Sequence, residues 1–434
     1  MMKKLLIFLL LLPLFTQAQD SLQIQRQQSI RVLFDSLKTH PQTIGDQLNM
    51  EKALVGKHMV TGMLYPKVNA FGRYEYSNTP NGMLPLAPND LLTMVKDQTV
   101  PQPFSKNIFR VGVGVSMPVF ALSIYTTAAK AKAMYQSAAA KAGINLQENE
   151  ALIVSTNANL QYLHELLTAL AAKKVSLAKT LSVIKMQVEN GRASKTALLK
   201  IRNAMNEINI LDNNIRQQQQ KALSAIRSLT GIMLQQPVKM IQTGTYQNGS
   251  LKVLEPLRKK AEADKFAWRA EKEKLIPAIY FNGNYNRSTA KAYNNNLNIN
   301  EDYGTMALTL DIPLFAKSQY AVIKKSKIDY ESSLNNLKKL HLELGSQAQA
   351  LENNLALLNS SVKLYQNSVK DKKELLKIAR VSYLSHRMTV EDYLKYEDDL
   401  VLEKSHLYSA MAKKWQTLMQ LAVIYGNNIE QIVK

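Results

Sequence analysis

The side chains best suited to chemistry are the six histidines, and their surroundings match no familiar catalytic or metal-binding pattern. His164-Glu165 is not followed by a second histidine at the spacing of a zinc-protease helix. The chain also has no Gly-x-Ser-x-Gly nucleophile turn and no phosphate-binding loop. Three more histidines fall in segments of helical periodicity, where a surface or helix-contact role is the simpler interpretation: His58, His341 and His406. The sequence therefore predicts a protein that is not an enzyme and holds no cofactor or metal.

The elements that position the polar residues are organised as an internal duplication. Pro118 and Pro313 each close an alternating segment and precede a long segment without proline, and they lie 195 residues apart. Gly191-Arg192-Ala193-Ser194 and His386-Arg387-Met388-Thr389 keep the same offset. Further pairs keep it as well: Leu199 with Leu394, and Gly231 with Gly426. A constant offset without gaps indicates a structural repeat.

Each repeat contains a long helix with a coiled-coil seam. In the first copy the seam residues follow alternating steps of three and four, with Lys174 as the interruption: Leu160, Leu163, Leu167, Leu170, Leu177, Leu181, Ile184 and Val188. Adding 195 gives a similar seam in the second copy, with Lys372 as the exception. From Pro118 to Gly191 such a helix would be roughly 110 Å long at about 1.5 Å per residue. A cytoskeletal type of coiled coil is the alternative that this stretch alone leaves open.

The N-terminus predicts export. Lys3 and Lys4 precede an apolar run over residues 5–15, which is too short to span a bilayer as a mature helix. Thr16-Gln17-Ala18 then offers small residues at the third and first positions before a cut, so we expect a secretory signal cleaved after Ala18. The chain contains no Cys, and we expect neither disulfides nor a lipid anchor. No later stretch is apolar enough for a transmembrane helix.

The net charge of +21 raises nucleic acid as a possible partner. The basic residues are scattered along helices rather than gathered in one arm, and aromatic residues do not alternate with them as stacking platforms. Export also argues against it. We therefore interpret the charge as solvated helix faces and expect no nucleic-acid binding.

Four segments, two in each repeat, change from helical periodicity to strict alternation. Residues 68–76 and 109–117 alternate apolar or small side chains with polar or small ones, and residues 279–286 and 305–312 do so in the second repeat. Residues 77–107, rich in Pro, and 287–302, rich in Asn, are predicted as loops. The offset between the repeats is 211 at Pro66 and Pro277 but 195 at Pro118 and Pro313, so the first hairpin is 16 residues longer. Strands of about 9–11 residues with one apolar face suit a membrane-spanning barrel.

Four strands are too few to close a barrel, because the smallest closed barrels have about eight. Two chains would supply eight strands and a filled interior, and three would supply about twelve with room for a passage. A small soluble sandwich is disfavoured because two widely separated hairpins cannot build a two-sheet core. The duplication therefore predicts an oligomer, and a water-filled lumen favours a trimer.

Taken together, the signal segment, the two copies of strand–loop–strand–Pro–long helix, and the Gly191-x-x-Ser194 turn followed by Leu199 resemble the outer-membrane efflux protein (TolC-like) family. The resemblance covers almost the whole mature chain and depends on order and spacing. It implies a mainly α fold with a small β part. Long antiparallel coiled-coil helices would form an α-barrel, and two β-hairpins would add four strands to a trimeric, twelve-stranded transmembrane β-barrel.

The same resemblance implies the domain boundaries. We expect a signal peptide at 1–18, a first repeat at 19–242 with a hairpin at 67–118 and a tip at 188–196, a linker at 243–250, and a second repeat at 251–434 with a hairpin at 278–313 and a tip at 383–391. Because the linker and the tail after Gly426 are short, only a small belt is expected around the middle of the helices.

In the family that this chain resembles, the helical turns close the tunnel and contact the adaptor. Gly191 suits a left-handed cap, and Ser194 suits an N-cap. In the second turn His386 replaces the glycine, while Thr389 keeps the N-cap position. Histidine tolerates positive φ less well than glycine does.

Some members of that family narrow the pore with two acidic residues one helical turn apart. Asp392 aligns with the first, but Lys395 stands where the second would be. Arg192 and Arg387 make the tips basic, together with Lys195. We therefore predict that the acidic constriction is not kept as such. Solvated charges or contacts with the adaptor are the alternative interpretation.

The resemblance implies an outer-membrane exit duct of a tripartite efflux pump or of a type I secretion system, through which substrates pass passively. Its partners would be two further copies of the chain, a periplasmic adaptor (membrane fusion) protein, an inner-membrane transporter of RND or ABC type, and outer-membrane lipid, with the helical part in the periplasm. A periplasmic coiled-coil scaffold without a conducting pore is the alternative from another class.

Overall fold

The computed structural model describes residues 29–385 and 387–434, which form two compact units. The helical unit contains the described residues up to Leu48, Ala139–Glu255 and Lys338–Lys434. The sheet unit contains Asn49–Ala138 and Pro256–Leu337. Each unit therefore takes segments from both predicted repeats. The expected signal segment at 1–18 and His386 lie outside the described residues.

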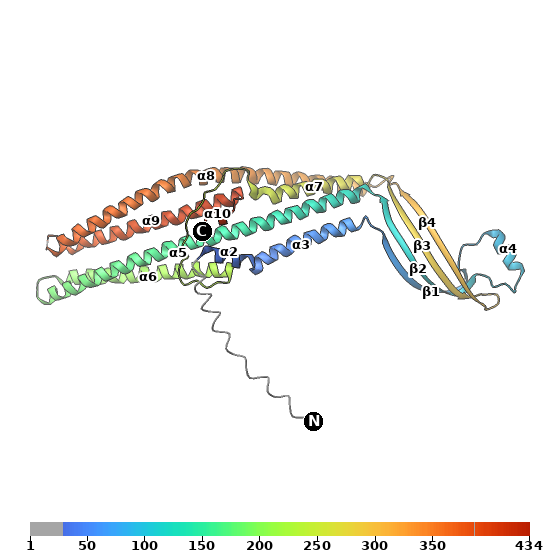
Figure 1. Ribbon diagram of the computed structural model, residues 1–434, viewed down its shortest axis with the longest axis horizontal. Coiled ribbons are helices and arrows are strands. Elements are labelled where there is room, and N and C mark those ends of the chain that lie inside the picture. Colours follow the sequence, from blue (N-terminus) through green and yellow to red (C-terminus); the bar gives the residue numbers. More distant parts are fainter. Residues whose placement is uncertain (1–28, 386) are drawn as a thin grey trace, which may run out of the picture. The chain divides into compact units, whose positions relative to one another are not determined.

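Two pairs of helices of matching length dominate the chain (Figure 1). α5 (Leu122–Glu189) and α8 (Lys317–Leu384) have 68 residues each, and α6 (Lys195–Thr230) and α9 (Val390–Tyr425) have 36 residues each. These lengths agree with the constant offset in the sequence. The shorter helices are α2 (Ile30–Lys38), α3 (Pro41–Gly62), α4 (Pro88–Lys96), α7 (Glu255–Glu273), α10 (Ile429–Ile432) and the 3₁₀ turn η1 (Lys252–Leu254). Among the described residues, no helix is both long enough and apolar enough to cross a membrane.

The predicted seam is buried in the first copy and only partly buried in the second. On α5 its best-covered members are at most 3% exposed: Leu160, Leu163, Leu170, Leu177 and Ile184. On α8 the seam residues Leu355, Val369 and Ala379 are buried, and the other seam positions are half-buried. Apolar side chains on a different stripe of α8, spaced at multiples of seven residues, are 64–68% exposed: Leu357, Leu364 and Ile378. Within the described residues, this stripe of α8 therefore has no cover.

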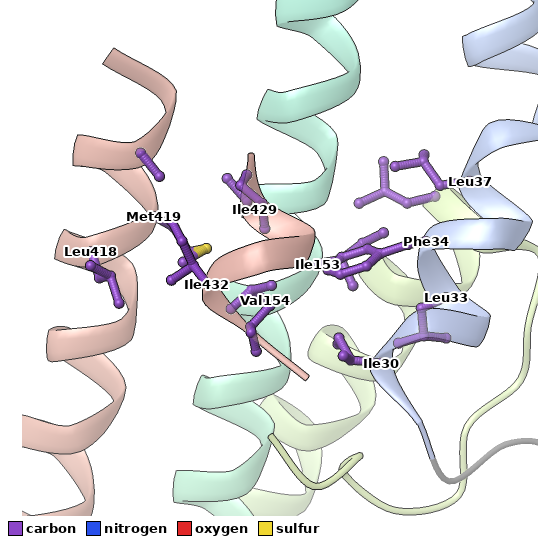
Figure 2. Close-up of a cluster of buried hydrophobic side chains, with 14 of the residues drawn as sticks. Ile30, Leu33, Phe34, Leu37, Ile153, Val154, Leu418, Met419, Ile429 and Ile432 are labelled. Atoms are coloured by element: carbon purple, nitrogen blue, oxygen red, sulfur yellow. The ribbon is translucent and has the colours of Figure 1, made fainter. Parts of the chain in front are cut away.

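The core of the helical unit brings both ends of the described chain against the middle of α5. α2 carries apolar residues at helical spacing, and Ser29 caps it by accepting from the N–H of Arg31. Phe34 of α2 and Ile429 of α10 pack in one cluster with Ile153 of α5 (Figure 2). The short α10 is thereby held by burial rather than by its own length, since four residues do not form a stable helix alone.

The segment that links the two repeats lies along the C-terminal tail. Ile241 and Lys434 exchange backbone hydrogen bonds of 2.8 and 3.0 Å. The buried side-chain amide of Asn157 on α5 donates to the carbonyl of Val238 at 2.7 Å and accepts from its N–H at 2.9 Å. One side chain thus satisfies both backbone groups of a residue that has no secondary-structure partner there.

The sheet unit contains one antiparallel sheet of strand order β1-β2-β3-β4 (Figure 1). Its strands are β1 (Lys67–Gly82), β2 (Phe104–Phe120), β3 (Ala278–Lys291) and β4 (Asn298–Asp311). The two predicted hairpins are confirmed, and they join because β2 pairs with β3, with Val113 opposite Tyr285. β1 and β4 are the edge strands.

The register gives the sheet one polar and one apolar face. Arg73, Arg110, Ser288 and Glu301 are directly opposite one another across the four strands, so they share a face. The other face carries large apolar side chains that the described chain leaves exposed: Tyr74, Val111, Val113, Tyr285, Met306 and Leu308. Met306 is 86% exposed. The alternation predicted from the sequence is confirmed.

The predicted loops are wrong in extent. β1 continues to Gly82 and β2 begins at Phe104, so the hairpin spans 67–120 rather than 67–118, and the connection folds a helix of its own, α4 (Pro88–Lys96). In the second hairpin only residues 292–297 connect β3 to β4, and β4 ends at 311 rather than 313. Polar composition suggested loops, but cross-strand pairing satisfies the backbone of these residues regardless of side-chain polarity.

Candidate functional site at the helical turns

The first turn joins α5 to α6 through a glycine cap and a serine cap. Gly191 has φ +69°, a left-handed conformation that is strained for residues with a Cβ atom. The N–H of Arg192 donates to the carbonyl of Gln187 at 2.7 Å, which closes the last turn of α5. Ser194 Oγ accepts from the backbone N–H three residues later at 3.2 Å. Both predicted caps are confirmed, and the Arg192 side chain is exposed.

The second turn joins α8 to α9 around a threonine cap. The N–H of Arg387 donates to the carbonyl of Ser382 at 2.9 Å. Thr389 Oγ1 accepts from the N–H of Asp392 at 3.1 Å and donates to its carboxylate at 2.7 Å. The predicted cap at Thr389 is confirmed, whereas the prediction for His386 falls outside the described residues.

The negative charge of Asp392 in the second turn is compensated by a neighbouring lysine. Lys395 Nζ lies 3.2 Å from Asp392 Oδ1, three residues away on the same helix. The hydrogen bond from Thr389, and then the one from Lys395, lower the pKa of Asp392 below its ordinary value. The aspartate is therefore ionised at neutral pH, but its field is compensated by an adjacent ammonium group.

Ion pairs connect the two helical hairpins close to these turns. Lys200 of α6 and Glu391 of α9 form a pair with an N–O distance of 2.5 Å. Farther from the turns, Lys173 of α5 pairs with Asp398 of α9. The two turns are thus neighbours, because Glu391 in the first turn of α9 contacts Lys200 in the second turn of α6.

A buried polar cluster adds a second contact between α5 and α9. Ser176 Oγ donates to Glu397 Oε1 at 2.6 Å and lies 3.0 Å from the hydroxyl of Tyr393. Tyr393, only 3% exposed, donates to the same carboxylate at 2.6 Å and stacks on Tyr383 with ring centroids 5.1 Å apart. Burial, followed by the Glu397 carboxylate, raises the pKa of Tyr393 to about 12. This tyrosine therefore stays a neutral donor at physiological pH.

Sequence reasoning found the turn residues but missed the pairs between hairpins. Partners such as Lys200 and Glu391 lie 191 residues apart, and no periodicity within one helix identifies which residue of the other hairpin faces them. A polar residue at a seam position was the only available signal, and Lys173 lies next to the predicted interruption at Lys174. Within the described part of the chain, no three His, Asp or Glu side chains are grouped as metal ligands would be.

Comparison with known proteins gives matches in structure only. No family model and no curated protein matches this sequence. The CmeC outer membrane channel of Campylobacter jejuni superposes with a TM-score of 0.76 at 13% identity, over 92% of this chain and 85% of that one. The outer membrane protein VceC of Vibrio cholerae gives 0.75 at 13% identity, over 93% and 97%. The chain has a TolC-like channel fold.

The open state of the MtrE outer membrane channel of Neisseria gonorrhoeae is similar as well, with a TM-score of 0.75 at 12% identity over 92% of this chain and 89% of that one. At such identity the likeness shows the fold and does not extend to particular residues. This agrees with the sequence, where the spacing of landmarks carried the resemblance.

Proposed function

We propose that this protein is an outer-membrane exit duct. It works as a homotrimer, conducts substrates passively from the periplasm or from an inner-membrane transporter, and serves a tripartite efflux pump or a type I secretion system. Its likeness to outer-membrane channels over more than nine-tenths of the chain supports this function. The observation that carries the proposal is the incomplete sheet.

The sheet is unfinished in two respects. β1 and β4, with 16 and 14 residues, each leave one row of backbone N–H and C=O groups without a strand partner within the described residues. Long edge strands of this kind pair with further strands wherever these are available. The sheet also exposes an apolar face, which is costly in water and stabilising against lipid.

Closing the sheet into a ring with further copies of the chain would pair the two edge strands and place the apolar face against lipid. Pairing β4 of one chain with β1 of the next leaves no free edge once the ring is complete. Three chains give about twelve strands, with the apolar face toward lipid and the polar face around a water-filled lumen. The exposed stripe of α8, including Leu357 and Leu364, supplies a second surface for another copy in the helical unit.

The turns of the helical hairpins are the proposed contact with a periplasmic adaptor and the proposed gate. Exposed basic residues lie at these turns, Arg192 and Lys195 in the first and Arg387 in the second, together with the exposed acidic residues Glu189 and Glu391. Because Asp392 is paired with Lys395, we infer a constriction without strong cation selectivity. Planar-bilayer recordings of Asp392→Ala should show ion selectivity close to that of the parent. Strong cation selectivity in the parent that disappears in the variant would contradict this inference.

A non-conducting periplasmic scaffold is the alternative function. The long helices suit it, but the exposed apolar sheet face does not, because a scaffold surrounded by water has no use for that face. The choice between drug, metal or polypeptide cargo belongs to the transporter partner, so efflux and type I secretion both stay open.

The test is extraction from the outer membrane with detergent, followed by native mass measurement and single-channel recording. A trimer with steady conductance is expected. A water-soluble dimer that does not conduct would contradict the barrel and favour the scaffold.

A further inference from the structure

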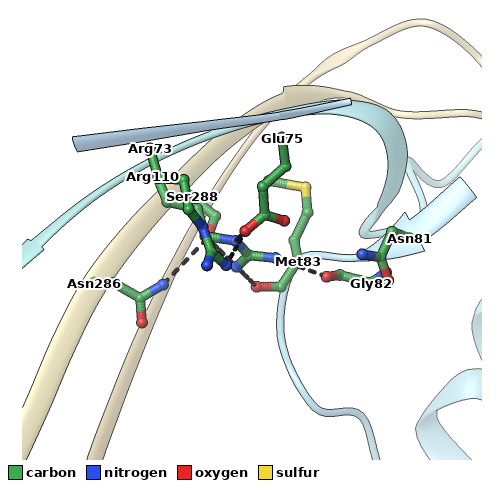
Figure 3. Close-up of polar contacts among 8 residues, drawn as sticks. All are labelled: Arg73, Glu75, Asn81, Gly82, Met83, Arg110, Asn286 and Ser288. Atoms are coloured by element: carbon green, nitrogen blue, oxygen red, sulfur yellow. Dashed lines mark hydrogen bonds and ion pairs between the residues drawn. The ribbon is translucent and has the colours of Figure 1, made fainter. Parts of the chain in front are cut away.

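The first hairpin sends part of its connection back over the polar face of the sheet. We call residues Gly82–Leu84 the strap. The pairing of β1 with β2 shifts between Tyr76 and Asn81, and after this irregularity the chain reaches the strap at the loop end of the sheet. Figure 3 shows the strap beside Arg110, Ser288 and Glu75, whose side chains belong to the polar face.

Arg110 holds the strap by its backbone. One terminal nitrogen of its guanidinium donates to the carbonyl of Met83 at 2.7 Å and also to Ser288 Oγ at 2.7 Å. The other donates to the carbonyl of Gly82 at 2.9 Å. Nε of the same group lies 3.3 Å from Glu75 Oε1. The terminal nitrogens therefore donate to two strap carbonyls and to a neighbouring strand, while the charge lies beside a carboxylate, and only the planar fork of arginine provides this geometry.

The side chain of Met83 anchors the strap from the other direction. It is 1% exposed and lies in a small apolar cluster with Ile108, Ala290 and Ile299. In the register of the sheet, Ile108 is opposite Ala290, and Ala290 is opposite Ile299. These residues continue the face of Arg110, since Ile108 lies two positions before it on β2. The polar face thus becomes apolar at its loop end, where the strap covers it.

The connections of the two hairpins also bind one another. The amide of Asn294 donates to the carbonyl of Val100 at 2.9 Å and accepts from the N–H of Gln102 at 3.1 Å. Asn295 donates to the carbonyl of Thr99 at 3.0 Å. The strap is therefore the inner edge of a folded loop assembly rather than a free chain end.

The hairpin does not need this arrangement in order to fold. The second hairpin connects its strands through residues 292–297 alone, and of these Ala292 joins the cluster around Met83. Arg73 offers an internal comparison, because it is opposite Arg110 on the same face and carries the same charge. Its ion pair goes to Glu75, and its side chain is 66% exposed, whereas that of Arg110 is 14% exposed. The positive charge of an arginine on this face therefore does not by itself explain why Arg110 is buried; its contacts with the strap do.

We propose that the strap, pinned by Arg110, narrows the outlet of the duct from inside the lumen. The proposal rests on the proposed function in one respect, since the polar face lines a lumen only if the sheet closes into a barrel. The strap would then be an exit constriction, separate from the gate at the helical turns, and Arg110 is the positioning residue that sets its closure.

Thiol labelling of the full-length protein tests the closure directly, because the chain has no cysteine. Ser288→Cys places a nearly isosteric thiol at a position that is 0% exposed next to the strap. Asn284→Cys places one on the exposed part of the same strand and face. With a charged, water-soluble thiol reagent, Ser288→Cys should react far more slowly than Asn284→Cys.

Adding Arg110→Ala to Ser288→Cys should speed its labelling roughly tenfold or more, because two hydrogen bonds from a charged group to the strap are lost. Arg73→Ala removes the same charge and should leave the rate unchanged. Arg110→Lys should also speed the labelling of Ser288→Cys, since one ammonium group cannot bind both strap carbonyls and also face Glu75. Because this variant keeps the positive charge, it serves as a second test if Arg110→Ala misfolds. Equal rates for the two cysteines in the parent, or slow labelling after Arg110→Ala, would overturn the proposal.

Single-channel recording separates this proposal from the function on which it rests. A higher conductance for Arg110→Ala than for the parent and for Arg73→Ala is expected. An equal rise in both variants would mean a charge effect in the lumen and would overturn the strap as a constriction. If neither the parent nor any variant conducts while the labelling rates are as expected, the exit-duct function is wrong, but the closure of the strap over the sheet by Arg110 is confirmed.

Discussion

Glu150 is a carboxyl group in the core of the helical unit, and Glu150→Gln tests what its charge costs. The side chain is 5% exposed and is followed on α5 by the buried Ala151. Burial raises the pKa of Glu150 to about 7, and the nearby Glu430 carboxylate adds to the shift. Lys38, hydrogen-bonded to Glu430 at 2.6 Å, opposes it. Lys38 itself stays charged, because the pair with Glu430 raises its pKa.

The sign of the pH dependence follows from proton binding. The ordinary pKa of a glutamate is 4.5, so between pH 4.5 and about 7 the folded protein keeps a proton that the unfolded chain has released. The contribution of Glu150 to stability is therefore fully present below this window and is lost as the pH rises through it. One pKa unit corresponds to about 1.4 kcal/mol, so the loss approaches about 3 kcal/mol above about pH 8.

Glutamine has the same shape and no charge to bury. Denaturant unfolding of the purified protein should therefore show Glu150→Gln close to the parent near pH 5 and more stable by about 3 kcal/mol near pH 8. Glu148→Gln, the same change at an exposed position two residues away, should show no such divergence. A difference between Glu150→Gln and the parent that stays constant from pH 5 to pH 8 would refute the desolvation argument.

Three further predictions follow from other contacts. Asn157→Leu leaves the buried backbone N–H of Val238 without a partner and removes one of the two donors to its carbonyl, so it should cost about 2–3 kcal/mol in chemical denaturation and speed proteolysis in residues 232–250. Gln161→Ala removes only the other donor to that carbonyl and should cost less. Tyr393→Phe should lower the free energy of unfolding by only about 1 kcal/mol, because Ser176 can still donate to the Glu397 carboxylate. A thermal melt that shows a loss as large as that of Asn157→Leu would contradict this prediction. Gly112→Ala would place a Cβ atom 2.6 Å from the carbonyl oxygen of Tyr285 and 2.8 Å from the ring of Phe71, which distorts the sheet. On native gels this variant should lose the proposed detergent-extracted trimer. Gly72→Ala, whose Cβ atom would have nothing within 4 Å, should keep it.

Most of the helical architecture was predictable because the spacing of apolar residues along the sequence indicates it. A seam with steps of three and four identifies which side of α5 is buried, and Leu160 and Leu177 are 0% exposed as it requires. The caps at Ser194 and Thr389 were predictable because a cap depends on residues within one turn. The strand faces followed from alternation, which sets side-chain direction independently of the partner strand.

The strap and the contacts between hairpins were not predictable in this way. Arg110 read as one polar residue of an alternating strand, and nothing near it in sequence shows that Gly82 and Met83 return to it. The loop from 77 to 107 was interpreted from composition, whereas the connection between β1 and β2 folds α4 and then contacts the second hairpin, for example through Val100 and Asn294.

The sequence by itself determined the duplication, the helix lengths, the caps and the two faces of the sheet. These depend on interactions within a few residues, whose geometry the chain imposes locally. Only the tertiary structure decided which charges pair between hairpins, that Glu150 is desolvated, and that Arg110 holds the strap. Those outcomes depend on which surfaces meet after the chain has folded, and the free energy of a charge is set by the groups that replace its water.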